Sequence, residues 1–266
     1  MRCTLSGVSR LIRHGTALAY VDAGAGDPAL VFVHGIACNR AFMAPQVRRF
    51  EVRHRVLAVD LRGHGDSDAP RQRYTIGGLA DDLGWLCNQL DISRPVVIGH
   101  SLGGLVALEL AATRPELVSG AALIDSVLLS GVARQDTVNE LIAGLRGADG
   151  HRVLSDYFEQ FFAPHDDRML RDWILEQAVR TPSHVTSSIW EESLQTWDDA
   201  RALRCCRVPL LYLDAGTPNA DLVRAVRLNP SLMIGRTVGT GHFSHLVSPQ
   251  QVNAMIERFL EVGLST

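Results

Sequence analysis

The sequence lacks the features that mark several large classes of protein. It has no cysteine pair in the C-x-x-C spacing of a zinc site or redox motif, and its five cysteines are scattered and odd in number. We therefore expect neither a metal site nor a disulfide framework, and adjacent Cys205 and Cys206 are expected to be reduced thiols. No basic cluster interleaved with aromatic residues occurs, and the formal net charge is −3. Nucleic acid is therefore not an expected partner.

Long hydrophobic runs are also missing. No stretch approaches the roughly 18 apolar residues of a membrane-spanning helix, so we expect no membrane segment. The first 20 residues carry no long apolar run after their positive charges, so no signal peptide is expected. A cytoplasmic location follows by default. Internal repeats and low-complexity segments are absent as well.

What is present is an alternation of apolar strands and helices. The chain has 266 residues, of which 46% are hydrophobic and 21% charged, so a sizeable core can form. Continuous apolar strands alternating with helices predict a parallel sheet covered on both faces, with ligands beyond the carboxyl ends of the strands. The expected strands are 30–33, 56–59, 96–98, 121–124, 209–213 and 232–234, and the expected helices lie near 41–50, 76–90, 102–113 and 249–262.

The pattern changes in the middle of the chain. Residues 127–206 are helix-like, contain no strand run and hold three of the four tryptophans. We interpret them as a helical cap inserted into an α/β core whose two parts are residues 1–126 and 207–266. Most of its aromatic residues are expected to form the cap's own core. Those that face the strand ends are expected to set substrate choice.

One segment carries a specific chemical signal. A β-branched run leads into Gly99-His100-Ser101-Leu102-Gly103, and a helix-forming run follows. This strand–turn–helix order is the context in which a G-x-S-x-G motif presents a nucleophile. The turn is tight, so the residues two places either side of Ser101 must lack a β-carbon. Ser101 is therefore the expected nucleophile.

A serine nucleophile needs a base and an oxyanion hole. His242 stands on a Gly-rich loop after a strand, and an imidazole can accept and return the serine proton. The nearby His245 is a competitor, and His100 is expected to be a structural neighbour. Ile36, after the strand at 31–33, and Leu102 are the expected backbone N–H donors to the oxyanion. The polar turn 60–67 is expected to be structural.

The motifs together resemble those of the α/β-hydrolase superfamily. These are His34-Gly35, the segment 60–67 (DLRGHGDS), the segment 99–104 (GHSLGG) and Gly241-His242-Phe243, in that order. The resemblance runs from about residue 15 to 262 and weakens in the cap. It implies a mostly parallel sheet of about eight strands and a Ser-His-acid triad without a cofactor. The superfamily includes members that are not hydrolases, so the fold does not decide the reaction.

The triad acid is where the sequence departs from most members. Their acid follows the strand at 209–213, and here Asn219 occupies that place, with Asp214 and Asp221 nearby. A second place known in the superfamily is the end of the strand after the nucleophile helix, which here is Asp125. The lactonases that open zearalenone are similar in using this second place and in their Gly-Thr-Pro tail. We favour Asp125, with Asp214 and Asp221 as alternatives.

These features predict a serine hydrolase. The expected substrate is a carboxylic ester or lactone of an apolar, cyclic or aromatic small molecule, cleaved through an acyl-enzyme without cofactor or metal. A cofactor-independent ring-opening dioxygenase and a carbon–carbon bond hydrolase are the alternatives on the same fold. A non-catalytic binding module would require a degraded triad, and no candidate residue is missing. The chain is expected to be a monomer or homodimer.

Overall fold

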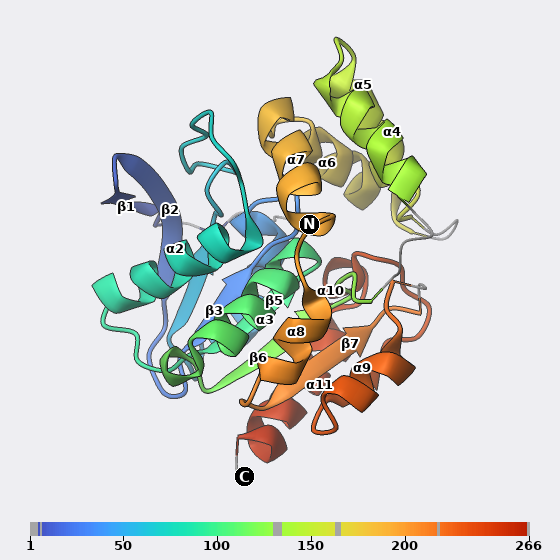
Figure 1. Cartoon of the computed structure of the whole chain (residues 1–266). Helices are drawn as coiled ribbons and strands as arrows, with labels where there is room; N and C mark the ends of the chain where they lie inside the picture. Colours follow the sequence, from blue (N-terminus) through green and yellow to red (C-terminus); the bar gives the residue numbers. More distant parts are fainter. Residues whose placement is uncertain (1–4, 6, 130–134, 163–165, 217–218, 265–266) are drawn as a thin grey trace.

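An eight-stranded sheet forms the centre of the molecule (Figure 1). The computed structural model describes residues 5, 7–129, 135–162, 166–216 and 219–264. The strand order is β1-β2-β4-β3-β5-β6-β7-β8; β1 and β4 pair antiparallel to β2, and all other pairs are parallel. The strands are β1 (Ser9–Arg13), β2 (Thr16–Ala23), β3 (Leu30–Val33), β4 (Val56–Val59), β5 (Val96–His100), β6 (Gly120–Ile124), β7 (Leu210–Asp214) and β8 (Met233–Arg236).

Helices cover both faces of the sheet and enclose two cores. Side chains of α2 (Ile76–Gln89), α3 (Leu102–Thr113) and α8 (Asp199–Cys205) pack on one face. Side chains of α1 (Ala44–Phe50) and α11 (Pro249–Gly263) pack on the other. The shorter elements are the 3-10 turns Arg40–Met43 and Pro115–Leu117, α9 (Leu222–Leu228) and α10 (Ser244–Val247). The expected α/β-hydrolase architecture is confirmed.

The parallel strands follow from their sequence. β3, β4, β5, β6 and β7 are buried along their whole length, because helices cover both of their faces. All six predicted strands are confirmed. β1 and β2 lie before residue 30, where the sequence pattern predicts no strand. β1 is mostly exposed at the sheet edge and carries no apolar run, so hydrophobicity gave no signal for it.

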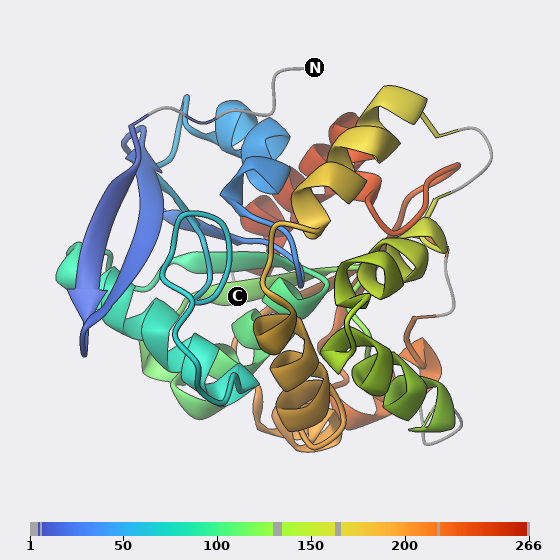
Figure 2. The same cartoon turned by 90° about the horizontal axis from the view of Figure 1, so that it is seen from above.

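Helices that follow β6 lie over the carboxyl ends of the strands. They are α4 (Gln135–Arg146), α5 (Gly150–Glu159), α6 (Arg168–Ala178), α7 (Ser183–Ile189) and the π-helical turn η4 (Trp190–Leu194). In Figure 2 they cover the half of the sheet away from β1 and β2. Residues 130–134 and 163–165 of the expected cap lie outside the described residues. The cap limits at 127 and 206 stay a prediction, and α8 within them packs against α3.

The two ends of this helical segment are fastened together. The Leu129 N–H donates to Asp199 Oδ2 at 2.6 Å, and Leu128 forms a β-bridge with Ala220. On α3, Glu109 Oε2 accepts from Trp197 Nε1 at 2.8 Å and from Arg201 at 2.6 Å. The chain thus leaves and re-enters the sheet layer at one hydrogen-bonded place.

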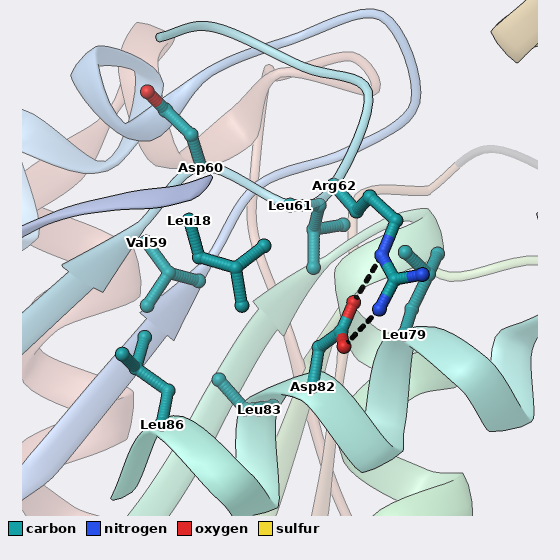
Figure 3. A pocket seen from close by; sticks show the side chains of 9 residues that line it. All are labelled: Leu18, Val59, Asp60, Leu61, Arg62, Leu79, Asp82, Leu83 and Leu86. Atoms are coloured by element: carbon teal, nitrogen blue, oxygen red, sulfur yellow. Dashed lines mark hydrogen bonds and ion pairs between the residues drawn. The ribbon is translucent and has the colours of Figure 1, made fainter. Parts of the chain in front are cut away.

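The turn 60–67 has a structural role. The buried Asp60 carboxylate accepts from the N–H groups of Arg40 at 2.6 Å and Asp66 at 2.8 Å. Arg62 pairs with Asp82 on α2 (Figure 3), and its Nε lies 2.7 Å from Asp82 Oδ2. The apolar cleft beside this pair holds only about 10 Å³, room for about one water molecule. The segment therefore braces the loop after β3.

None of the helices in the described part of the chain combines the length and hydropathy that a bilayer crossing needs.

Several histidines are buried in the protein interior. Burial lowers the pKa of His34 to about 4 and the pKa values of His64 and His245 to about 3. Both ring nitrogens of His245 lack a hydrogen-bond partner among the described residues, so its ring is neutral in the native state.

These histidines should make the fold sensitive to acid. A histidine in the unfolded chain titrates near pH 6.5, so the unfolded state binds more protons than the native state below that pH. Stability is therefore lost as pH falls from about 6.5 toward the folded pKa, by about 1.4 kcal/mol per pH unit for each such residue. His245→Leu should reduce the stability loss between pH 7 and pH 5 by about 2 kcal/mol in urea unfolding. His151→Leu, at an exposed position, should leave that loss unchanged; an unchanged loss in His245→Leu would contradict the prediction.

Candidate functional site

Ser101 lies on a strained turn between β5 and α3. Its φ of 51° and ψ of −117° are unfavourable for a residue with a side chain. A β-carbon on Gly99 would overlap the backbone of Gly103, and one on Gly103 would overlap the carbonyl of Val33. The Ser101 N–H continues the sheet ladder to the Ile124 carbonyl at 2.9 Å. The close approach of helix and strand thus requires both glycines, and it places Ser101 at the carboxyl end of β5.

The loop after β3 approaches Ser101 from one side. A β-carbon on Gly35 would lie 2.9 Å from His100 Nδ1 and 3.2 Å from the Ser101 Cβ, so a side chain there would crowd Ser101. Ile36 and Leu102, the expected oxyanion donors, line the same cavity as Ser101. Leu102 is the first residue of α3, so its N–H has no carbonyl partner within that helix.

His34 holds this loop in place. Its Nε2 accepts from the Leu61 N–H at 3.0 Å, so the proton must be on Nδ1, which donates to the Gly35 carbonyl at 2.7 Å. Burial lowers the His34 pKa to about 4 and keeps this neutral tautomer. The turn 60–67 therefore fixes the backbone that precedes Ile36.

Asp125 and His242 come together at the ends of β6 and β8. His242 Nδ1 lies 2.7 Å from Asp125 Oδ2, and both residues are buried. Asp125 has a positive φ of 47°, which turns the chain sharply at the strand end. A buried carboxylate at this distance from Nδ1 requires that nitrogen to carry the proton. This leaves Nε2 as the nitrogen that can accept a proton.

The alternative acids are engaged elsewhere. Asp214 Oδ2 accepts from Arg236 Nε at 2.6 Å, and Asp214 Oδ1 accepts from the Gly216 N–H at 2.8 Å. Asp221 caps α9 by accepting from the Arg224 N–H at 2.9 Å. The structure thus brings Asp125 to His242 and gives Asp214 and Asp221 other partners.

Sequence reasoning missed the part that Asn219 takes in this arrangement. Asn219 Nδ2 donates to Asp125 Oδ2 at 2.8 Å, and the Ala215 N–H donates to Asp125 Oδ1 at 3.2 Å. Asn219 was singled out only because it replaces the usual acid. An amide at that place is itself a signal, since it can donate to a carboxylate elsewhere. Thr217 and Pro218 of the expected tail lie outside the described residues.

His100 holds the backbone of His242 by a hydrogen bond. Its Nε2 lies 2.9 Å from the His242 carbonyl, which can only accept, so the proton is on Nε2. Burial lowers the pKa of His100 well below its ordinary value. The ring of His245 lies 4.2 Å from that of His100, centroid to centroid, behind the cavity. His245 does not line the cavity, whereas His242 does.

A cavity of about 600 Å³ connects these residues, a size typical of small-molecule sites. Most of its lining is apolar and comes from the core and from the helices over the strand ends. Polar and charged residues make up the rest of the lining. The apolar members are Ile36, Leu102, Leu105, Val127, Leu129, Val138, Leu141, Val153, Tyr157, Phe158, Phe161, Trp190, Leu194, Trp197 and Phe243. The charged members are Glu140, Asp156, Asp199 and Arg224.

The aromatic residues over the strand ends divide into two groups. The ring of Phe161 lies on His242, with centroids 4.4 Å apart, and Trp190 packs edge-on against Tyr157 at 5.3 Å. These residues line the cavity. Trp173 does not; it packs against Phe42 at 4.6 Å and belongs to the interior contact between helices and core.

The described residues include no group of three or more histidine, cysteine or acidic side chains that could hold a metal ion. The site offers a serine at a helix N-terminus, a histidine with one nitrogen bonded to a carboxylate, and backbone N–H groups beside the serine.

Comparisons with known proteins agree with this architecture. The family model described as alpha/beta hydrolase fold matches residues 28–249. An uncharacterized protein of Mycobacterium tuberculosis is 39% identical, over 93% of this chain and 79% of that protein. The 2-(acetamidomethylene)succinate hydrolase of Mesorhizobium japonicum is 28% identical, over 96% of this chain and 95% of that protein.

A solved structure gives the same result for the fold. The enol-lactonase from Burkholderia xenovorans LB400 superposes with a TM-score of 0.86 at 23% identity, covering 95% of this chain and all of that one. The family match spans most of the sequence and includes β3 to β8. The chain therefore belongs to the family of proteins with the alpha/beta hydrolase fold.

Proposed function

We propose that the protein is a serine hydrolase that cleaves a carboxylic ester or lactone of an apolar small molecule. The family and its named relatives support a hydrolase. The observation that carries the finer proposal is the cavity shared by Ser101 and His242, with Asp125 bonded to the far side of the imidazole. The likeness to zearalenone lactonases remains a prediction.

The arrangement supports a two-step acyl transfer. His242 Nε2 takes the proton of Ser101 as Oγ bonds to the substrate carbonyl carbon, and the carbonyl oxygen becomes an oxyanion. The N–H groups of Ile36 and Leu102 stabilise that charge. The C–O bond to the leaving alkoxide then breaks, and the imidazolium gives it the proton. In the second step His242 takes a proton from water, and the water oxygen bonds to the acyl carbon. The bond from that carbon to Ser101 Oγ then breaks, the imidazolium returns the proton to Oγ, and the acid leaves. When the substrate is a lactone, the alcohol and the acid are parts of one product molecule.

The cavity lining supports an apolar acyl or alcohol group. Aliphatic and aromatic side chains make up most of the wall, so burial of apolar substrate surface against it is favourable. Glu140 and Asp156, two exposed members of the lining, are acidic, which disfavours a substrate with several negative charges. The site therefore suits a neutral ester or lactone.

Ser101→Ala should abolish turnover. Without Oγ no acyl-enzyme forms, and hydrolysis of short-chain p-nitrophenyl esters and lactones should fall by about 10⁴ to 10⁶. Mass spectrometry after fluorophosphonate treatment should find the adduct on Ser101 in the parent protein. An adduct on another serine, or oxygen consumption with a hydroxy-quinolone in a protein inert toward esters, would overturn the proposal in favour of another reaction.

Asp125→Asn should lower turnover by about 10⁴ while the fold is retained, because an amide favours the wrong imidazole tautomer. The matched controls are Asp214→Asn and Asp221→Asn, whose carboxylates bond to Arg236 and to the start of α9. Both should stay within about tenfold of the parent. An inactive Asp214→Asn beside an active Asp125→Asn would reverse the assignment.

The tryptophans over the strand ends should differ in their effect on selectivity. Trp190→Ala enlarges the cavity wall and should change the ratio of kcat/KM between bulky and short acyl esters by about 10- to 100-fold. Trp173→Ala removes a contact with Phe42 outside the cavity, so it should lower thermal stability and leave the ratio unchanged. Equal ratios in the parent and Trp190→Ala would assign Trp190 a purely structural part.

A further inference from the structure

Asn219 and Asp125 come from neighbouring strand ends and converge on one imidazole. Asp125 follows β6, and Asn219 lies in the loop between β7 and α9. Asp125 Oδ2 accepts both from His242 Nδ1 at 2.7 Å and from Asn219 Nδ2 at 2.8 Å. Asn219 Nδ2 itself lies 3.5 Å from His242 Nδ1. The three side chains thus form one compact buried group.

We propose that Asn219 is a positioning residue for the triad, and that a carboxylate and an amide can exchange places between positions 125 and 219. This inference rests on the proposed function, in which Asp125 is the triad acid. Asn219 would hold the Asp125 carboxylate at the angle that the imidazole requires. The site would then accept its acid from either strand.

Charge and hydrogen bonding support the first half of the proposal. Asp125 is fully buried, and a buried carboxylate is costly unless several donors surround it. An ionised carboxylate only accepts, so the Asn219 atom 2.8 Å away must be the amide nitrogen. The Ala215 N–H serves the other oxygen. Removing the Asn219 amide would take away one donor to Oδ2, the oxygen that also accepts from the imidazole.

The backbone supports the second half. The Asn219 carbonyl accepts from the Leu128 N–H at 3.1 Å, and Leu128 pairs with Ala220. The backbone at Asn219 and Ala220 is therefore held by bonds that do not involve the Asn219 side chain, which is buried and lines the cavity. Asn219 Nδ2 already lies 3.5 Å from His242 Nδ1, so a carboxylate at position 219 would need only a small side-chain movement to accept a hydrogen bond from the imidazole. An amide at 125 would then donate to it, so the group would keep one negative charge.

The first experiment removes the amide. Asn219→Ala should lower kcat for p-nitrophenyl acetate by about 10- to 100-fold, the loss expected for one hydrogen bond to a charged group, and leave KM within about threefold. The rate of fluorophosphonate labelling of Ser101 should fall in parallel. Asn219→Ser, which retains a donor, is the second variant if Asn219→Ala does not fold, and it should retain more activity than Asn219→Ala. Folding is checked by thermal unfolding.

The second experiment exchanges the two groups. The double variant Asp125→Asn/Asn219→Asp should be at least about 100-fold more active than Asp125→Asn alone. The matched control Asp125→Asn/Asn219→Ala should be no more active than Asp125→Asn. Asn219→Asp alone places two carboxylates side by side, so the acid limb of its pH–rate profile should move to higher pH.

The outcomes separate this inference from the proposed function. If Asp125→Asn is as active as the parent, the triad assignment itself fails. If Asp125→Asn is inactive, folded Asn219→Ala matches the parent in kcat and pH profile, and the exchange recovers nothing, the triad stands and the inference is overturned. A merely structural Asn219 would lower stability without moving kcat or the pH profile.

Discussion

The close contact between α3 and the ends of β3 and β5 is the constraint on which the site depends. Gly103 packs its backbone against the carbonyl of Val33, and Gly99 leaves room for Gly103. No side chain fits between helix and sheet there, so the chain must turn sharply at Ser101 and adopt a positive φ. The strain is held because both flanking elements are buried on all sides. Ser101 is thereby directed to the edge where the other strands end.

A second constraint is the need to bury charge at that edge. Asp125 lies in the interior, where a carboxylate is stable only among donors. Its partners come from the ends of β7 and β8, so the sheet register brings them together. Asp214, one strand away, meets the same need with the exposed side chain of Arg236 and a backbone N–H. Two aspartates on adjacent strands thus differ in chemistry because different neighbours surround them.

The sequence predicted the parallel strands, the tight turn at Ser101 and the helices beside them, because each carries a strong local pattern of apolar runs or glycines. It favoured Asp125 as the partner of His242 because Asn219 stands at the usual place of the acid and because Asp125 ends the strand after α3, which resembles the second acid position of the superfamily. It did not reveal β1, whose exposed residues carry no hydrophobic period, or the π-helical turn at Trp190. The bond from Asn219 to Asp125 joins residues 94 apart in the chain. Such a contact depends on loop conformation, which no local pattern encodes.

The fastening of the helical segment at its two ends has a consequence for how such proteins diverge. Leu129 bonds to Asp199, and Trp197 and Arg201 bond to Glu109, so the chain returns to the sheet layer beside the place where it leaves. The residues between can change in number and kind without disturbing the strand ends. The helices that cover the cavity can therefore change during evolution, while Ser101, Asp125 and His242 at the strand ends keep their geometry.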